Sequence, residues 1–270
     1  MGKAGSPFGV WLVRGVIGTL GLMAVIGSFT FVPALERRGL PGAAVAIGAL
    51  VLFGAWSVWV VWSVRARPAR SRAVEHHAMR IGAAFAGQPS LPRSMGKLPS
   101  FSELSGTSGV RDLLTYRADG RPRLVFDRWF EPAEAYRPTR WWTMAATRID
   151  ADALQVRIEP RSMVPPVGDG LIEVGSESRG FDARFRVLAM DARFANALVD
   201  QRMMLWLLSR DDEATFEVGG PWAAALCPGL TPTDGCDDLV AVLDLFVAHL
   251  PPVIHSLRPA VDPAFEPPGS

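Results

Sequence analysis

The sequence predicts an α+β protein: an N-terminal transmembrane helical hairpin, then a mainly antiparallel sheet domain with helices inserted late and a C-terminal helix. Two nearly uncharged apolar stretches come early in the 270 residues, strand-like alternation fills the middle, and helical spacing dominates the last third. We expect a two-span anchor with a basic juxtamembrane segment at 1–72, and an amphipathic stretch and linker at 73–109. A cytoplasmic α+β domain at 110–258 and a flexible tail at 259–270 follow.

The anchor consists of two apolar segments, each long enough to cross a bilayer. Residues 10–32 contain one charge, Arg14, close to one end, where its long side chain can reach the headgroups. Residues 43–64 contain none, and a helix of this length spans roughly 33 Å against a hydrocarbon core of about 30 Å. A cleaved signal peptide is the alternative for the first segment, but the apolar run is too long and a second span follows at once.

Charges and tryptophans beside the spans predict their orientation. Six Lys or Arg flank the two outer ends of the hairpin, against two in the loop at 33–42, so both termini are expected in the cytoplasm of a cell-membrane protein. The tryptophans at the same ends fit a membrane interface. The predicted membrane-interface residues are Trp11, Arg14, Trp59, Trp62, Arg65, Arg67, Arg70 and Arg72.

Charge is divided unevenly along the chain. Residues 1–72 hold eight Lys or Arg and one Glu, a net charge of +7, whereas residues 73–270 hold twenty cations and twenty-six acids, a net charge of −6. Binding to nucleic acid depends on clustered cations, so the acidic domain is not expected to bind it. The lipid bilayer is the expected partner of the basic end, where residues 65–72 either attract anionic headgroups or serve only to set the topology.

Small residues recur along the first span, at Gly15, Gly18, Gly21, Ala24 and Gly27. Helices in lipid associate through close packing of such residues. The pattern therefore fits either a homo-oligomer formed through this span or packing of the two spans on each other.

Alternating apolar and polar residues predict the sheet. Asp119-Gly120 is the two-residue signal for a type I′ turn between two antiparallel strands. The clearest strand is expected at 181–187, where four apolar residues alternate with three polar ones. The other expected strands lie at 113–116, 123–130, 141–149, 154–158 and 172–174, with a closing hairpin of 215–218 and 222–226 around Gly219-Gly220.

Helical spacing follows the strand at 181–187. Asp191 and Asp200 can each cap a helix, and the second of these helices would bury Leu207. Asp237 is expected to open a last helix that ends before Pro251. Phe185 and Leu207 are expected in the core. His76-His77, next to the arginines, fits a solvated juxtamembrane face.

Three segments in this region carry a resemblance to a known group of proteins. GFDARFRV at 180–187, DARFA at 191–195 and QRMMLWLL at 201–208 resemble a set of actinobacterial two-span membrane proteins of unknown function. Their pattern is a strand ES-x-x-F-N-x-x-F-x-V, then D-x-R-F-A and R-M-x-x-W-L. The likeness covers most of 75–258, but Asp182 stands where the pattern has Asn, and Gly180 is extra. The resemblance implies a membrane location and no particular activity.

Two residue sets resemble catalytic or metal sites without meeting their requirements. Cys227, Cys236, His249 and His255 follow the order of a zinc site, but eight residues separate the cysteines where two to four are usual. A disulfide is not expected in the cytoplasm. Ser178 lacks the first glycine of a nucleophile elbow, and a strand is expected after it instead of a helix.

The sequence thus gives no catalytic residue, cofactor or metal ligand. The leading hypothesis is a non-catalytic interaction domain at the inner leaflet that binds a protein partner. The alternative is a membrane-tethered, hydrolase-like enzyme whose site residues are dispersed in the sequence.

Overall fold

The computed structural model describes residues 54–55, 69–102, 106–133, 139–162, 170–211 and 213–258. The chain divides into two compact units, Met1–Arg70 and Ser71–Ser270. The predicted spans at 10–32 and 43–64 lie outside the described residues, apart from positions 54–55, and so does the predicted tail at 259–270. Among the residues that are described, no helix has both the length and the apolar character needed to cross a membrane.

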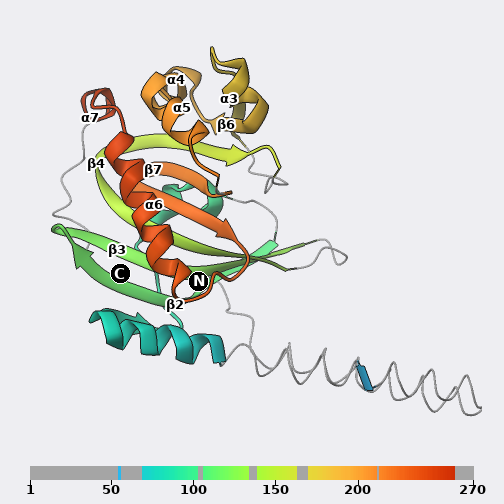
Figure 1. Cartoon of the computed structure of the whole chain (residues 1–270), viewed down its shortest axis with the longest axis vertical. Helices are drawn as coiled ribbons and strands as arrows, with labels where there is room; N and C mark the ends of the chain where they lie inside the picture. The colour runs from blue at the N-terminus through green and yellow to red at the C-terminus, as the bar shows by residue number, and fades with distance from the viewer. Residues whose placement is uncertain are drawn as a thin grey trace, which may run out of the picture. The chain divides into compact units, whose positions relative to one another are not determined.

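The second unit is built on a seven-stranded antiparallel sheet in the order β1-β2-β3-β4-β6-β5, with β7 paired to β4. One side of β4 pairs first with β3 and then with β6, while β7 runs along the other side. The long strand β4 therefore holds the sheet together (Figure 1). The strands are β1 (Ala84–Ala86), β2 (Gly106–Ala118), β3 (Arg121–Pro132), β4 (Arg140–Pro160), β5 (Ile172–Val174), β6 (Phe185–Ala189) and β7 (Thr215–Pro228).

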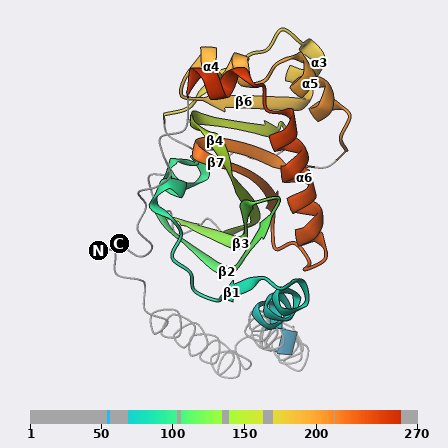
Figure 2. The same cartoon turned by 90° about the vertical axis from the view of Figure 1, so that its left-hand side faces the viewer.

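Helices cover both faces of this sheet. Figure 2 shows α6 on one side of the sheet, and the short helices η1 and η2 pack against β7 from the other. Residues 69–81 are also helical, and the part inside the second unit, residues 71–81, is called the entry helix below. The remaining helices are η1 (Arg93–Lys97), η2 (Pro99–Phe101), α3 (Arg179–Arg184), α4 (Ala192–Leu198), α5 (Gln201–Leu208), α6 (Gly235–His249) and α7 (Val253–Leu257).

The two faces carry separate apolar clusters. The larger cluster joins the sheet to α6, α4, α5 and the entry helix, and it contains Phe185 and Leu207, which are 3% and 0% exposed. Their predicted place in the core is confirmed. The smaller cluster lies on the opposite face, where Met95 and Leu98 of the η1 region pack onto Met144 and Trp222. The predicted α+β class with a mainly antiparallel sheet is confirmed for this unit.

Local signals for turns and caps are confirmed. Asp119 and Gly120 have φ values of 52° and 76°, as a type I′ turn requires, and they join β2 to β3. Asp191 accepts a hydrogen bond from the backbone N–H of Phe194 at 2.7 Å, which caps α4. Asp200 caps α5 in the same way, through Met203 at 2.8 Å.

The strand predicted at 181–187 is wrong in its first half. Residues up to Arg184 form α3, and β6 begins only at Phe185. The Ser178 hydroxyl accepts a hydrogen bond from the Phe181 N–H at 3.3 Å and so starts a helical turn. Phe181 then stacks on Phe185 at 5.3 Å, and this spacing of four residues fits a helical turn as well as a strand.

The predicted hairpin at Gly219-Gly220 is also wrong, because β7 continues through it. A side chain at Gly219 would collide with the backbone carbonyl of Lys97, and Gly220 has a φ of 57°. The two glycines thus permit close packing of η1 and a bend in the strand. The partner strand β4 is irregular where Ala153 pairs with Gly220. The two strands predicted at 141–149 and 154–158 are both part of β4, which is one continuous strand.

The segment expected to be a linker takes part in the domain. The described residues between 86 and 109 form η1, η2 and the start of β2, and Met95 and Leu98 are 1% and 0% exposed. The compact unit starts at Ser71 and so before the expected boundary at 110. The helix predicted to open at Asp237 is α6, which begins two residues earlier, at Gly235, and ends at His249; α7 (Val253–Leu257) follows it.

Candidate functional site

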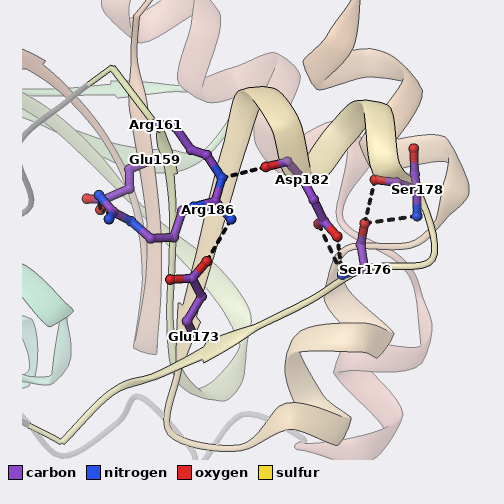
Figure 3. Close-up of polar contacts among 7 residues, drawn as sticks. All are labelled: Glu159, Arg161, Glu173, Ser176, Ser178, Asp182 and Arg186. Carbon is purple, nitrogen blue, oxygen red and sulfur yellow. Dashed lines mark hydrogen bonds and ion pairs between the residues drawn. The ribbon is translucent and has the colours of Figure 1, made fainter.

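Charged side chains form a row across β5, β6, β4 and β7. The Arg186 guanidinium on β6 binds Glu159 on β4 at 2.6 Å, and Arg161 just after β4 binds Glu173 on β5 at 2.6 Å. Figure 3 shows these two pairs side by side, with Asp182 next to Arg161. The row continues inward on β4 to Arg157, which binds Glu217 on β7 at 2.6 Å.

Burial of these pairs increases toward the centre of the sheet. The side chains of Arg161 and Glu173 are 40% and 47% exposed, whereas those of Arg157 and Glu217 are 1% and 0% exposed. The second oxygen of Glu217 accepts a hydrogen bond from the Ser100 N–H at 3.1 Å, which ties η2 to the sheet. Burial raises the pKa of the Glu159 carboxyl above its ordinary value, although Arg157 and Arg186 act to lower it. The ion pairs of this row fix the register of the strands and the position of η2. Arg157 and Glu217, at its inner end, are closed to solvent.

Ser178, considered as a nucleophile, serves as a helix cap. Its hydroxyl accepts the Phe181 N–H, and its backbone N–H donates to the Ser176 hydroxyl at 3.1 Å. Both carboxylate oxygens of Asp182 accept a hydrogen bond from the Ser176 N–H (Figure 3). A helix does follow Ser178, contrary to the expectation of a strand, but these contacts order a turn and place no histidine beside the hydroxyl.

The four residues with zinc-like order are not brought together. Cys236 is buried at the start of α6, and His249 ends the same helix, so about 20 Å of helix separates them. The His249 ring stacks on Trp206 at 4.9 Å. Cys227 lies at the end of β7, and His255 on α7 contacts the carbonyl of Asp150 at 2.9 Å. Burial raises the pKa of the Cys227 thiol, as for an unreactive cysteine.

The entry helix is attached to β2 at its first turn. The Ser71 hydroxyl donates to the Asp112 carboxylate at 2.7 Å, and Arg111 binds the other oxygen of Asp112 at 2.9 Å. Asp112 is 3% exposed and has a φ of 56°, at a point where the pairing of β2 with β3 shifts register. A left-handed residue other than glycine is uncommon, and this bulge turns the carboxylate toward the helix.

A second polar contact holds the entry helix against α6. Arg80 donates to Nδ1 of His77 at 2.6 Å, and Nε2 of His77 faces Asp237 at 3.2 Å. A guanidinium can only donate, so Nδ1 is the acceptor, and Nε2 carries the hydrogen that Asp237 receives. His77 is 3% exposed, which corrects the expectation of a solvated His76-His77 pair, although His76 is exposed.

Tyr116 of β2 lies beside this contact. Burial raises the pKa of its phenol above 10.0, and the Asp237 carboxylate adds to the effect. Arg123 acts in the opposite direction, while Asp244 raises the pKa further. Arg123 binds Asp244 at 2.7 Å and Thr147 at 2.7 Å, which joins β3 and β4 to α6. The polar groups around the entry helix therefore connect it to both the sheet and α6.

Beyond its first turn, the outer face of α6 carries three apolar residues, with the Asp244 side chain 39% exposed at its edge. Ala241, Leu245 and Ala248 are exposed at helical spacing, and Leu245 is 48% exposed. The opposite face, with Leu239, Leu243 and Phe246, is buried against the sheet. The outer face of a helix that packs on a sheet is normally polar, so an exposed apolar stripe opposite the buried one is unusual. This outer face, defined by Ala241, Leu245 and Ala248, is called the α6 surface below.

Only two of the predicted membrane-interface residues are described. Arg70 is half-buried and Arg72 is exposed, at the start of the helix of residues 69–81. Trp11, Arg14, Trp59, Trp62, Arg65 and Arg67 lie outside the described residues.

The attachment of the entry helix to the domain was not predicted from the sequence. The signal was present as Val74, His77 and Ala78, a buried set with spacing i, i+3 and i+4. Arg123 and Glu217 carried no local signal, because Thr147 and Arg157 lie 24 and 60 positions away from them. Asp112 has a neighbouring partner in Arg111, but its contact with Ser71 spans 41 positions. Such pairs become visible only when the strand order is known.

Comparison with known proteins supports the fold. No family model matches this chain, and no curated protein does. The structure is similar to the crystal structure of the mycobacterial trehalose monomycolate transport factor A, TtfA, with a TM-score of 0.50 and 13% sequence identity. The similarity covers 72% of this chain and 98% of the TtfA chain. The α+β domain therefore shares its fold with TtfA.

Proposed function

We propose that this protein is a membrane-anchored, non-catalytic factor whose domain binds a helix of an integral membrane partner. The observation that carries the proposal is the α6 surface, an exposed apolar stripe on a helix whose opposite face is buried against the sheet. Asp237 and Asp238 are exposed at one end of this helix, so a partner helix with cations at that end would complement it.

The anchor in this proposal comes from the sequence. Two spans at 10–32 and 43–64, with the basic segment at 65–72, would hold the domain at the inner leaflet with both termini in the cytoplasm. The actinobacterial two-span proteins of unknown function that the sequence resembles would be its family. The shared fold with a transport factor supports a role beside a membrane transport system over a role in catalysis.

The hydrolase-like alternative receives no support from the described residues. Ser178 is engaged as a helix cap, and the inner charged pairs are buried as partners of each other. Around Tyr116, the charges are paired across elements and hold the entry helix and α6 in place.

A photoreactive amino acid at position 241, in the full chain in native membranes, tests the proposal. We expect a crosslink to one integral membrane transport protein. The crosslink should disappear on Leu245→Arg, which places a charge in the α6 surface without disturbing the core. The matched control carries the photoreactive residue at position 119, in the exposed β2–β3 turn, and should give no such crosslink.

Two results would contradict the proposal. One is a crosslink that survives Leu245→Arg or appears equally from position 119. The other is a crosslink only to lipid or to a second copy of the chain. Leu245→Arg should not change the unfolding temperature, and a large fall would show that the side chain belongs to the core.

A further inference from the structure

We propose that the entry helix, residues 71–81, detaches reversibly from the domain and so sets how far the domain reaches from its anchor. The reach rests on the anchor of the proposed function, whereas the detachment rests on the structure of this unit alone. Two of its polar contacts, Ser71 with Asp112 and His77 with Asp237, lie near the two ends of its buried face, and Arg111 also donates to Ser71 at 3.3 Å.

Both contacts can open without leaving an unpaired charge in the core. Asp112 keeps its ion pair with Arg111 when Ser71 leaves, and Asp237 is 55% exposed, so water can replace His77. Arg80, the other partner of the His77 ring, is exposed at the surface. The buried pair of Arg157 and Glu217 is different, because separating it would leave a charge in the protein interior.

The apolar attachment of the entry helix is small. Its buried face consists of Val74 and Ala78 beside His77, whereas Met79 on its outer face is 69% exposed. The strands below it are held by pairing along β2, β3 and β4 that is irregular at the Asp112 bulge and does not involve the helix. Local opening of this element is therefore expected to occur without unfolding of the sheet.

Detachment would lengthen the connection between the domain and the predicted second span. The detached segment unwinds, because an isolated helix of fewer than about 12 residues is not stable in water. Its eleven residues measure about 16 Å as a helix and up to about 36 Å when extended. The domain would gain on the order of 20 Å of reach.

Hydrogen exchange on the full chain in detergent or nanodiscs tests the proposal. We expect amides of residues 75–81 to exchange faster than those of β4 and β7 in the unmodified chain. Asp237→Ala should accelerate residues 75–81 by a further factor of about ten, the effect of one lost hydrogen bond, and leave β4 and β7 unchanged. Asp238→Ala, an exposed neighbour on the same turn, is the matched control and should have no effect.

Equal protection of residues 75–81 and of β4 would overturn the proposal, because the helix would then open only with the whole domain. An Asp237→Ala effect no larger than that of Asp238→Ala would overturn it as well. The first comparison needs no variant and stands if Asp237→Ala fails to fold. Neither readout depends on a partner, so failure here leaves the α6 surface proposal untouched, and failure of the crosslink leaves detachment untouched.

Discussion

Charged residues inside this domain are held by partners on other strands and helices. Arg157 and Glu217 face each other from adjacent strands, and Arg123 connects β3 with Asp244 of α6. Removing one member of a buried pair typically costs about 3–5 kcal/mol, because the other charge stays in the interior. These residues thus specify which strands and helices meet.

Tyr116 provides a spectroscopic test of the contacts around the entry helix. The chain has two tyrosines, so Tyr136→Phe leaves Tyr116 as the only phenol. We expect its pKa in the folded protein to lie above 10.0, chiefly because of burial, and to fall on Asp237→Asn, which removes the next largest cause. The ultraviolet absorbance of the phenolate, followed against pH, measures both values.

The same shift predicts the direction of the pH effect on stability. A phenol with a raised pKa in the folded state keeps its proton after the unfolded chain has lost its own. The contribution of Tyr116 to the free energy of unfolding is complete below the pKa of the unfolded chain and is lost as the pH rises through the pKa of the folded protein.

Asp238→Asn is the control for the absorbance measurement. A Tyr116 pKa that responds equally to Asp237→Asn and Asp238→Asn would place Tyr116 away from Asp237.

Elements whose signals are local were predictable from the sequence. The Asp119-Gly120 turn and the caps at Asp191 and Asp200 depend on residues within three positions, so the sequence contains all their determinants. The helical turn at α3 and the unbroken β7 depend on more. Phe181 fits two periodicities, and Gly219 is explained only by the carbonyl of Lys97, more than a hundred residues earlier.

The same limit applies to the candidate sites. The apolar outer face of α6 could be read from helical spacing, but its exposure depends on which face the sheet covers. His77 could have been placed on a buried helix face with Val74 and Ala78, whereas its contact with Asp237 spans 160 positions. Contacts of this range follow from the strand order and from no local pattern.

Gly219→Ala tests the interpretation of β7 as a continuous, closely packed strand. The added methyl group would meet the backbone of Lys97, which is part of η1 and cannot move as a flexible side chain would. We expect a loss of about 1–3 kcal/mol in the free energy of unfolding, the usual cost of overpacking. Urea denaturation measures it.

Gly180→Ala is the matched control for this substitution. Gly180 lies in α3 with no atom within 4 Å of an added methyl group, so alanine should leave stability unchanged or raise it by up to about 1 kcal/mol. Equal effects at positions 180 and 219 would contradict close packing of η1 on β7.

At the scale of the whole molecule, the domain begins well before the predicted boundary at 110. The entry helix contributes Val74 to the larger apolar cluster, and Phe85 of β1 packs against that cluster. The η1 region contributes Met95 and Leu98 to the smaller cluster. A soluble chain of residues 69–258 should therefore contain every element that the core needs. We expect it to be monomeric in solution and to unfold in a single cooperative transition.

A shorter chain of residues 90–258 tests what the first elements contribute. It lacks Val74 and Ala78 from the larger cluster, and β2 loses its pairing with β1. Burial of one valine side chain stabilises by about 1.5–3 kcal/mol, so the shorter chain should unfold at a clearly lower urea concentration with a smaller m value. Equal midpoints would show that the first elements lie on the domain without stabilising it. Aggregation of the longer chain would instead show that the α6 surface, or another apolar face, is completed by the predicted spans or by the partner, and the domain would then be stable only within a membrane assembly.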